Sequence, residues 1–155
     1  MRSTFIVTPN LCIGCRTCEL ACSFAHPVDG KPGQTRIVVK NSGVKDLWVP
    51  VVCLQCDDPA CVKSCLVDAL RRNPETGAVE LNQEKCVKCV ACVAACPFGC
   101  SIHDAQRNMI VKCDLCGGDP VCARFCPTGA LAFRPVTHAQ LSATSVPAAD
   151  TTSGK

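Results

Sequence analysis

The chain has 155 residues, of which seventeen are cysteine and only 4% are aromatic, and its formal net charge at pH 7 is +3. So few aromatic side chains imply a thin hydrophobic core, which needs cross-linking by something other than side-chain packing. No apolar run approaches the roughly 18 residues of a membrane span, and no basic stripe with interleaved aromatic residues indicates nucleic-acid binding.

The N-terminal third is predicted to consist of short strands and one short helix next to a cysteine-rich loop. The helix ends before Pro27, because a residue that precedes proline is disfavoured in the helical conformation. The predicted elements are strands at residues 4–8, 36–40 and 47–52, a helix at 19–25 and a proline- and glycine-rich loop at 27–34.

The remainder of the chain is predicted to contain a short helix and two β-hairpins. Residues 57–59 read DDP and suit the cap and first turn of a helix at 60–64. The turn NPETG lies between two short extended stretches and indicates a hairpin at 69–82, and a second hairpin is expected at 101–112. The residues after Pro135 are small, polar and without periodicity, which is typical of a disordered tail or of a segment that folds on a partner.

Sixteen of the seventeen cysteines fall into four groups that share one plan. Residues 86–97 read CVKCVACVAACP: three cysteines are separated by two residues each, and the fourth follows after three more and precedes proline. The first two groups have Ser23 and Leu66 in place of that proline, and the second and fourth groups have wider middle gaps. The groups are Cys12, Cys15, Cys18 and Cys22; Cys53, Cys56, Cys61 and Cys65; Cys86, Cys89, Cys92 and Cys96; and Cys113, Cys116, Cys122 and Cys126. Such recurrence indicates an internal repeat.

The C-x2-C-x2-C-x3-C-P run is typical of bacterial ferredoxins that bind cubane [4Fe–4S] clusters. Three thiolates on one tight loop reach three corners of a cube, whereas the fourth opens a helical turn, points away and serves the neighbouring cluster. A zinc site usually takes two ligands from each of two separated pairs, so the spacing fits zinc poorly. A disulfide framework needs an oxidising compartment, and residues 1–10 contain no apolar signal core. We therefore expect four [4Fe–4S] clusters in a cytoplasmic protein.

These clusters would also reverse the net charge. Each core with its four thiolates carries about −2, so four of them leave a total of about −5. This negative total is a second argument against a basic nucleic-acid-binding protein.

The four groups in this order resemble the four-cluster iron–sulfur subunits of the dimethyl sulfoxide reductase and formate dehydrogenase type, over about residues 5–134. Related small subunits accompany hydrogenases, carbon monoxide dehydrogenases and tungsten-dependent aldehyde oxidoreductases. Many relatives carry a C-terminal membrane-anchoring extension, which we do not expect for this chain. The resemblance implies an α+β fold of two dicluster ferredoxin-like domains, one inserted in the other. Residues 49–103 would form the inner domain and residues 1–48 with 104–135 the outer one, followed by the tail at 136–155.

The resemblance also implies that each group lends its fourth cysteine to a cluster of another group. The four ligand sets would be Cys12, Cys15, Cys18 and Cys126; Cys113, Cys116, Cys122 and Cys22; Cys53, Cys56, Cys61 and Cys96; and Cys86, Cys89, Cys92 and Cys65. The seventeenth cysteine, Cys100, is expected not to be a ligand. It occupies the place of Ala69 and Ala130 in the other groups, where a small buried side chain is needed, and a protonated thiol behaves as a small hydrophobe.

For the other candidate residues, a role in electron transfer competes with an ordinary structural role. Trp48 is interpreted as a packing residue rather than an electron relay. Three cations stand between cluster ligands, where they either raise the local potential or stay solvated without effect: Lys63, Lys88 and Arg124. The three histidines are scattered and are expected to be surface or loop residues: His26, His103 and His138.

These features predict a non-catalytic electron-transfer subunit. The clusters use all sixteen grouped cysteines, which leaves no open iron for a substrate, and no phosphate-binding glycine motif or nucleophile elbow is present. A structural or oxygen-sensing role would need only one cluster. The expected partners are a catalytic subunit, foremost a tungsten- or molybdenum-dependent enzyme such as aldehyde oxidoreductase, and a second redox protein. The second protein would be a flavin- and nicotinamide-linked subunit, a ferredoxin or another copy of the chain in a filament. The alternatives are a hydrogenase or carbon monoxide dehydrogenase partner, or a free-standing polyferredoxin.

Overall fold

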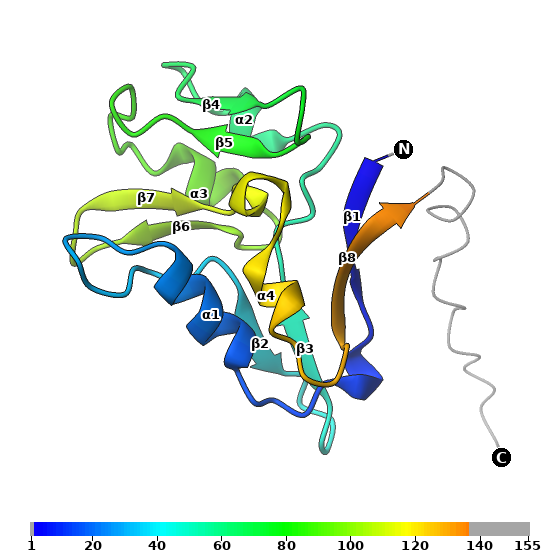
Figure 1. Cartoon of the computed structure of the whole chain (residues 1–155). Helices are drawn as coiled ribbons and strands as arrows, with labels where there is room; N and C mark the ends of the chain where they lie inside the picture. The colour runs from blue at the N-terminus through cyan, green and yellow to red at the C-terminus, as the bar shows by residue number, and fades with distance from the viewer. Residues whose placement is uncertain (1, 137–155) are drawn as a thin grey trace, which may run out of the picture.

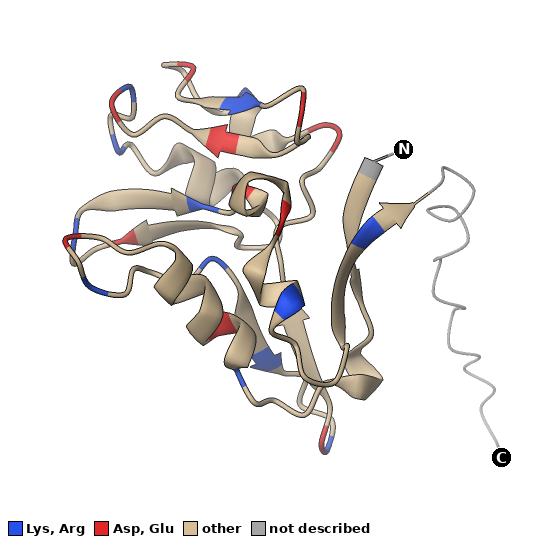
Figure 2. Cartoon of the chain, viewed as in Figure 1, with Lys and Arg blue, Asp and Glu red and all other residues tan. Residues whose placement is uncertain are grey.

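A computed structural model of the chain describes residues 2–136 (Figure 1). All but the first residue of the predicted tail, and His138 with it, lie outside the described residues. Positive and negative residues are interspersed along the described chain rather than separated (Figure 2). None of the helices in residues 2–136 is long and apolar enough to cross a membrane.

The secondary structure consists of short strands, short α-helices and two 3-10 helices. The strands are β1 (Arg2–Val7), β2 (Val38–Asn41), β3 (Trp48–Val51), β4 (Leu70–Arg72), β5 (Val79–Leu81), β6 (Ser101–Asp104), β7 (Met109–Lys112) and β8 (Leu131–Val136). The helices are η1 (Pro9–Leu11), α1 (Thr17–Ala25), α2 (Ala60–Lys63), α3 (Ala91–Ala95), η2 (Leu115–Gly118) and α4 (Val121–Arg124). The predicted strands, helices and hairpins are confirmed, with boundaries shifted by up to two residues.

The eight strands form four separate antiparallel pairs, which are β1–β8, β2–β3, β4–β5 and β6–β7. Three of the pairs join strands that are neighbours along the chain. In the fourth, β1 and β8 bring the two ends of the described chain side by side, with Arg2 opposite Val136 and Val7 opposite Leu131 (Figure 1). The rings of Phe5 and Phe133 face each other across this pair with their centroids 5.2 Å apart.

Helices end differently in groups with and without a proline after the fourth cysteine. In the third group Pro97 follows Cys96, whose extended backbone (φ −83°, ψ 110°) ends α3, as expected for a residue before proline. In the first group Ser23 stands in that place, and α1 runs on past Cys22 to Ala25 over nine residues. In the second group Leu66 stands there, yet α2 ends at Lys63, one residue short of its predicted extent, and its N-cap residue Pro59 makes no side-chain cap. A missing proline thus permits a longer helix but does not by itself produce one.

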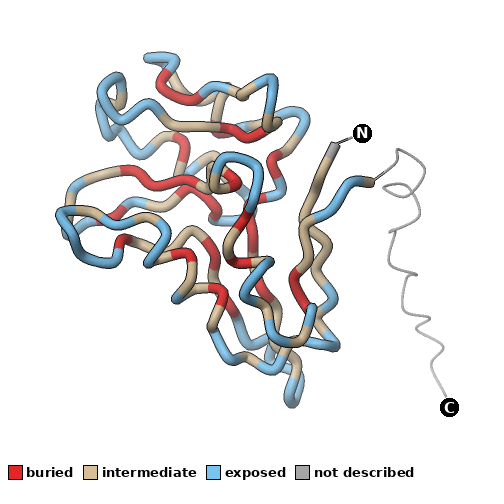
Figure 3. The backbone as a smooth tube through the Cα atoms, in the orientation of Figure 1, coloured by how far each residue is buried: buried red, intermediate tan, exposed pale blue. Residues whose placement is uncertain are grey.

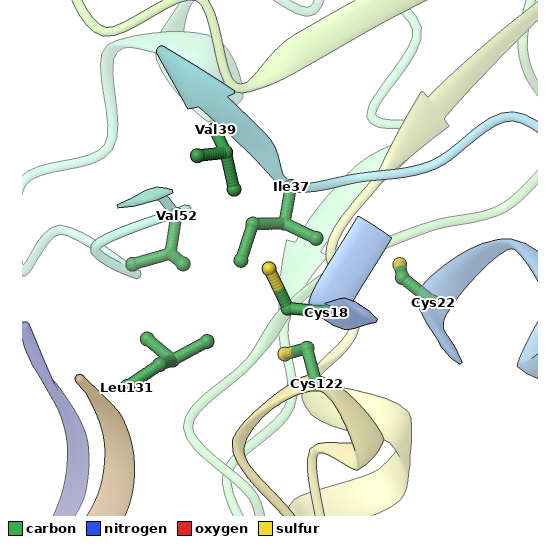
Figure 4. Close-up of a cluster of buried hydrophobic side chains, with 7 residues drawn as sticks. All are labelled: Cys18, Cys22, Ile37, Val39, Val52, Cys122 and Leu131. Atoms are coloured by element: carbon green, nitrogen blue, oxygen red, sulfur yellow. The ribbon is translucent and has the colours of Figure 1, made fainter. Parts of the chain in front are cut away.

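The hydrophobic core is divided into two small clusters, and buried residues alternate with exposed ones along most of the chain (Figure 3). The members of the first cluster are Cys18, Cys22, Ile37, Val39, Val52, Cys122 and Leu131 (Figure 4). Those of the second are Cys61, Leu70, Val79, Cys92 and Ile110. Helix α1 contacts α4 next to the first cluster, and α2 contacts α3 next to the second. Thus the first and fourth cysteine groups share one core, and the second and third groups share the other.

Candidate cluster-binding sites

The four cysteine loops repeat one backbone conformation. The residue two places after the first cysteine of each group has a left-handed φ; these residues are Gly14 (69°), Gln55 (50°), Lys88 (59°) and Leu115 (57°). Left-handed residues among right-handed ones turn successive backbone N–H groups toward a common concavity, which is the anion-binding arrangement seen around many iron–sulfur centres. The repeat inferred from spacing is therefore also a repeat of backbone geometry.

The third implied ligand set lines one cavity of about 200 Å³. Its walls include the side chains of Cys53, Cys56, Cys61 and Cys96, although Cys96 comes from a different group. Burial raises the pKa of the Cys61 thiol; nearby Lys112 opposes this rise, and the Cys53 and Cys96 thiolates add to it. The four cysteines thus line one cavity, as the implied ligand set requires.

The fourth implied set, Cys65 with Cys86, Cys89 and Cys92, lines a smaller cavity beside it. Apolar side chains of the second core, among them Leu70, Leu81 and Ile110, close this cavity. Burial raises the pKa of Cys92, and the Cys86 and Cys65 thiolates raise it further. This set too joins a fourth cysteine to the loop of another group.

The two remaining sets bring together the first and last groups of the chain. Burial raises the pKa of Cys18 to about 11, and the thiolates of Cys126 and Cys15 are among the neighbours that contribute. The pKa of Cys122 is raised by burial and then by Cys113, Cys22 and Cys116, in that order. Each fourth cysteine is thus close to the loop of another group, as the resemblance implies, and the ligand assignment itself stays a prediction.

Backbone N–H groups are directed at the fourth cysteines. The N–H groups of Ala69, Cys100 and Leu131 donate to the sulfurs of Cys65, Cys96 and Cys126 at 3.3, 3.3 and 3.4 Å, respectively. In the first group the donor is instead Arg36 N–H, 3.3 Å from Cys22, because helix α1 continues where the other groups turn. Burial alone would raise the pKa of Cys96, but these backbone bonds hold it below its ordinary value. A thiolate stabilised in this way is prepared for iron.

Sequence reasoning missed Lys112, the last residue of β7. Its side chain is buried, and its Nζ donates to Cys53 Sγ at 2.8 Å. It directly precedes Cys113, but Lys85 likewise precedes Cys86 and is exposed, so position in the sequence could not have singled it out. Of the cations that sequence reasoning did consider, Lys63 and Arg124 are exposed and paired with the carboxylates of Asp58 and Asp119. The third, Lys88, is also exposed.

His26 lies outside the regular secondary structure, as predicted, but it has partners that the sequence did not indicate. His26 follows α1 as its C-cap; its Nδ1 lies 2.8 Å from the Cys22 carbonyl and 3.8 Å from the Cys22 sulfur. Its Nε2 lies 3.2 Å from Asp114 Oδ1 and 3.9 Å from Cys116 Sγ. Hydrogen bonding to Asp114, and then to the two sulfurs, raises the pKa of His26 to about 12. The helix predicted at 19–25 was the available signal, because a helix that runs past Cys22 brings residue 26 back beside residue 22.

His26, Asp114 and Cys116 together are spaced closely enough to hold a metal ion, with ligand atoms within 4.8 Å of one another. The group has a simpler role, however. Asp114 accepts hydrogen bonds from Cys116 N–H at 2.9 Å and from the Arg36 guanidinium at 2.6 Å, so it fixes the fourth loop in place. His103 is exposed, as predicted.

Cys100 is buried, and its thiol donates to the Phe98 carbonyl at 3.6 Å. Burial, with the nearby Cys53 and Cys96 thiolates, raises the pKa of Cys100 to about 12, so it stays a neutral thiol. Its counterparts Ala69 and Ala130 are also buried. That Cys100 is not a ligand stays a prediction. Trp48 packs against the first core cluster, next to Gly14, which agrees with a packing role.

Repeated cysteine loops with left-handed turns, fourth cysteines close to the loops of other groups and a thin core are typical of a ferredoxin-type iron–sulfur protein with several clusters. Comparison with known proteins agrees. The family model described as a 4Fe-4S dicluster domain matches residues 44–136, and one described as a 4Fe-4S binding domain matches residues 9–25. The chain belongs to the 4Fe-4S dicluster family, and [4Fe–4S] clusters are its cofactors.

Named relatives are subunits of oxidoreductases. The chain is 42% identical over 125 residues to the polyferredoxin-like subunit of an aliphatic sulfonate oxidoreductase of Pyrococcus furiosus, covering 81% of this chain and 72% of the relative. It is 32% identical over 150 residues to the probable anaerobic dimethyl sulfoxide reductase chain YnfG of Escherichia coli, covering 85% and 73%. A solved structure of the active site complex BamBC of benzoyl coenzyme A reductase with benzoyl-CoA aligns at 21% identity with a TM-score of 0.48, covering 91% of this chain and 86% of that one. The protein is accordingly an iron–sulfur electron-transfer protein of the oxidoreductase-subunit kind.

Proposed function

We propose that the chain is a non-catalytic relay that holds four [4Fe–4S] clusters and carries electrons between a catalytic oxidoreductase subunit and a second redox partner. The observation that carries this proposal is that the fourth cysteine of each group lies close to the loop of another group, and that two of the implied ligand sets each line one cavity. When bound, such clusters supply one-electron transfer. The residues of the chain hold them, donate hydrogen bonds to their sulfurs and limit their contact with water.

The relay consists of two nested modules, residues 49–103 within residues 1–48 and 104–135. The division of the core supports this arrangement, because the first and fourth groups share one hydrophobic cluster and the second and third groups share the other. The pairing of β1 with β8 also supports it, since it joins the two chain segments assigned to the outer module.

Electrons enter and leave such a relay where a ligand reaches the surface. Of the sixteen grouped thiols only Cys15 and Cys89 are exposed, and they belong to different modules. Exposed apolar side chains lie close to each of them along the chain, Ile13 beside Cys15 and Val87 beside Cys89. Two accessible ligands with apolar surroundings fit two docking faces, one for each redox partner.

The catalytic partner is, in this proposal, a tungsten- or molybdenum-dependent oxidoreductase such as an aldehyde oxidoreductase. The similarity to subunits of sulfonate and dimethyl sulfoxide oxidoreductases supports a partner that is itself an oxidoreductase. The second partner is a flavin- and nicotinamide-linked subunit, a ferredoxin or another copy of the chain. Anaerobic co-purification from the native host, followed by metal analysis for tungsten, molybdenum and nickel, tests the first part. Gel filtration over a range of concentrations tests self-assembly: a complex of constant size excludes the filament.

The ligand sets are tested by counting iron in double variants. The parent chain should hold about sixteen irons after anaerobic reconstitution, and loss of any one cluster should remove about four. If Cys96 completes the site of Cys53, then Cys53→Ala with Cys96→Ala removes one cluster, so about twelve irons stay. Cys86→Ala with Cys96→Ala removes two clusters, so about eight irons stay. The opposite result would show that Cys96 binds the cluster of its own group, and a parent chain with zinc in place of iron would refute the relay itself.

A further inference from the structure

A single buried cation touches one of the sixteen grouped sulfurs. Among the described residues the only lysine or arginine in the buried class is Lys112, with 5% of its surface exposed. Its Nζ lies 2.8 Å from Cys53 Sγ, and none of the ion pairs found in residues 2–136 joins it to an Asp or Glu. Its positive charge is therefore directed at the ligand sulfur rather than at a carboxylate.

The hairpin β6–β7 holds this lysine in place. Lys112 pairs with Ser101 in the register of the two strands, and both residues are buried. A second link lies beside it: the side-chain amide of Gln55, in the same loop as Cys53, donates to the carbonyl of Cys113 at 2.9 Å. The strand that carries Lys112 and the loop that carries Cys53 are thus tied together, so the lysine keeps its position against the sulfur.

The neighbouring site of the same core has no such cation. The cavity lined by Cys65, Cys86, Cys89 and Cys92 is enclosed mostly by apolar side chains; Lys88, on its loop, also lines it but is exposed to water. An exposed charge is screened by solvent, whereas a buried one acts at low dielectric and is several times stronger. The two sites therefore differ in charge environment although their ligands are the same.

We propose that Lys112 is a positioning residue that raises the reduction potential of the site formed by Cys53, Cys56, Cys61 and Cys96 above that of the neighbouring site. Of the two sites, the one next to Lys112 is therefore the one that is reduced first. The inference rests on the ligand sets proposed above. An added electron increases the negative charge of the site by one, and a fixed positive charge in contact with a ligand sulfur stabilises that charge. The N–H···S hydrogen bond acts in the same direction.

The test uses the full chain, reconstituted anaerobically, with Lys112→Met as the neutral variant, Lys112→Arg as the variant that keeps the charge and Lys85→Met as the matched control. Lys85 also directly precedes the first cysteine of a group but is exposed. Potentiometric titration followed by electron paramagnetic resonance measures the potentials, and iron analysis measures cluster content. We expect Lys112→Met to keep its iron and to shift one potential to a more negative value, while Lys112→Arg and Lys85→Met leave all potentials unchanged.

Several results would overturn the proposal. Unchanged potentials in Lys112→Met, or an equal shift in Lys112→Arg, would show that the charge does not set the potential. Loss of about four irons in both Lys112→Met and Lys112→Gln would assign the lysine to holding the cluster instead.

A chain that also carries Cys56→Ala shows which cluster the lysine affects. With the site of Cys56 removed, Lys112→Met should leave the three other potentials unchanged, and a further shift would place the lysine at another cluster. If the parent chain itself binds no clusters, the proposed function fails, whereas unshifted potentials in a loaded Lys112→Met chain contradict this inference alone.

Discussion

Replacement of Cys100 by alanine tests whether this cysteine only packs in the core, in contrast to the sixteen expected ligands. The thiol is 5% exposed and makes one weak hydrogen bond, to Phe98 at 3.6 Å. The corresponding residues Ala69 and Ala130 are each 1% exposed, so the fold already accepts a methyl group at this place twice. The change removes one buried sulfur atom, comparable to one methylene, and should cost about 1 kcal/mol of unfolding free energy.

The expected result for Cys100→Ala is therefore a small fall in melting temperature, about 3 °C for a chain of this size, with full cluster content. Anaerobic circular dichroism measures the first quantity, and iron and sulfide analysis the second. Cys96→Ala serves as the control, because it should release about four irons. Loss of four irons from Cys100→Ala would show that this thiol coordinates iron, and the argument from its alanine counterparts would then be wrong.

Two further substitutions test the packing outside the ligand sets. Gly14→Ala should lower stability by about 2 kcal/mol or more in anaerobic thermal unfolding, because φ is 69° and the new methyl group would lie 2.7 Å from the ring of Trp48. Gly43→Ala, with φ 83° and no atom within 4 Å, is its control and should lose only about 1 kcal/mol from backbone strain; equal losses would mean that Trp48 is not the obstacle. Burial alone would raise the pKa of Asp104, but its bonds with Arg107 hold that pKa below its ordinary value. The carboxylate therefore stabilises the fold above about pH 4, and this contribution is lost as the pH falls further. Asp104→Asn should be less stable than the parent by a constant amount between pH 7 and about pH 4, with a difference that shrinks as the pH falls below about 4. A difference that stays the same below about pH 4 would contradict this.

The local parts of the fold could be predicted because their signals are local. The turn NPETG defines the hairpin of β4 and β5, and the proline after Cys96 ends α3. The spacing of the cysteines predicted tight loops, and the structure adds that each loop has a left-handed residue at the same place. Because that spacing is a local signal, the candidate ligands could be found without a structure.

The charges around the sites could not be predicted, because they depend on which strand packs on which loop. Lys85 and Lys112 have the same place relative to their cysteine groups, yet one is exposed and the other is buried against Cys53. The difference comes from the burial of β7, in which Ile110, Val111 and Lys112 all lie inside the fold. No pattern within one segment contains that information, since it arises from contacts between segments.

The strand pair β1–β8 has a consequence for synthesis of the protein. Residues 2–7 leave the ribosome long before the strand they pair with, residues 131–136, has been made. The segment from Cys53 to Cys96 is complete before that moment, so the middle of the chain can receive its iron while, under the proposed ligand sets, the loop of Cys12, Cys15 and Cys18 still waits for Cys126. Under those sets the three thiols of this loop stay open to oxidation during synthesis for longer than the thiols of the two middle groups.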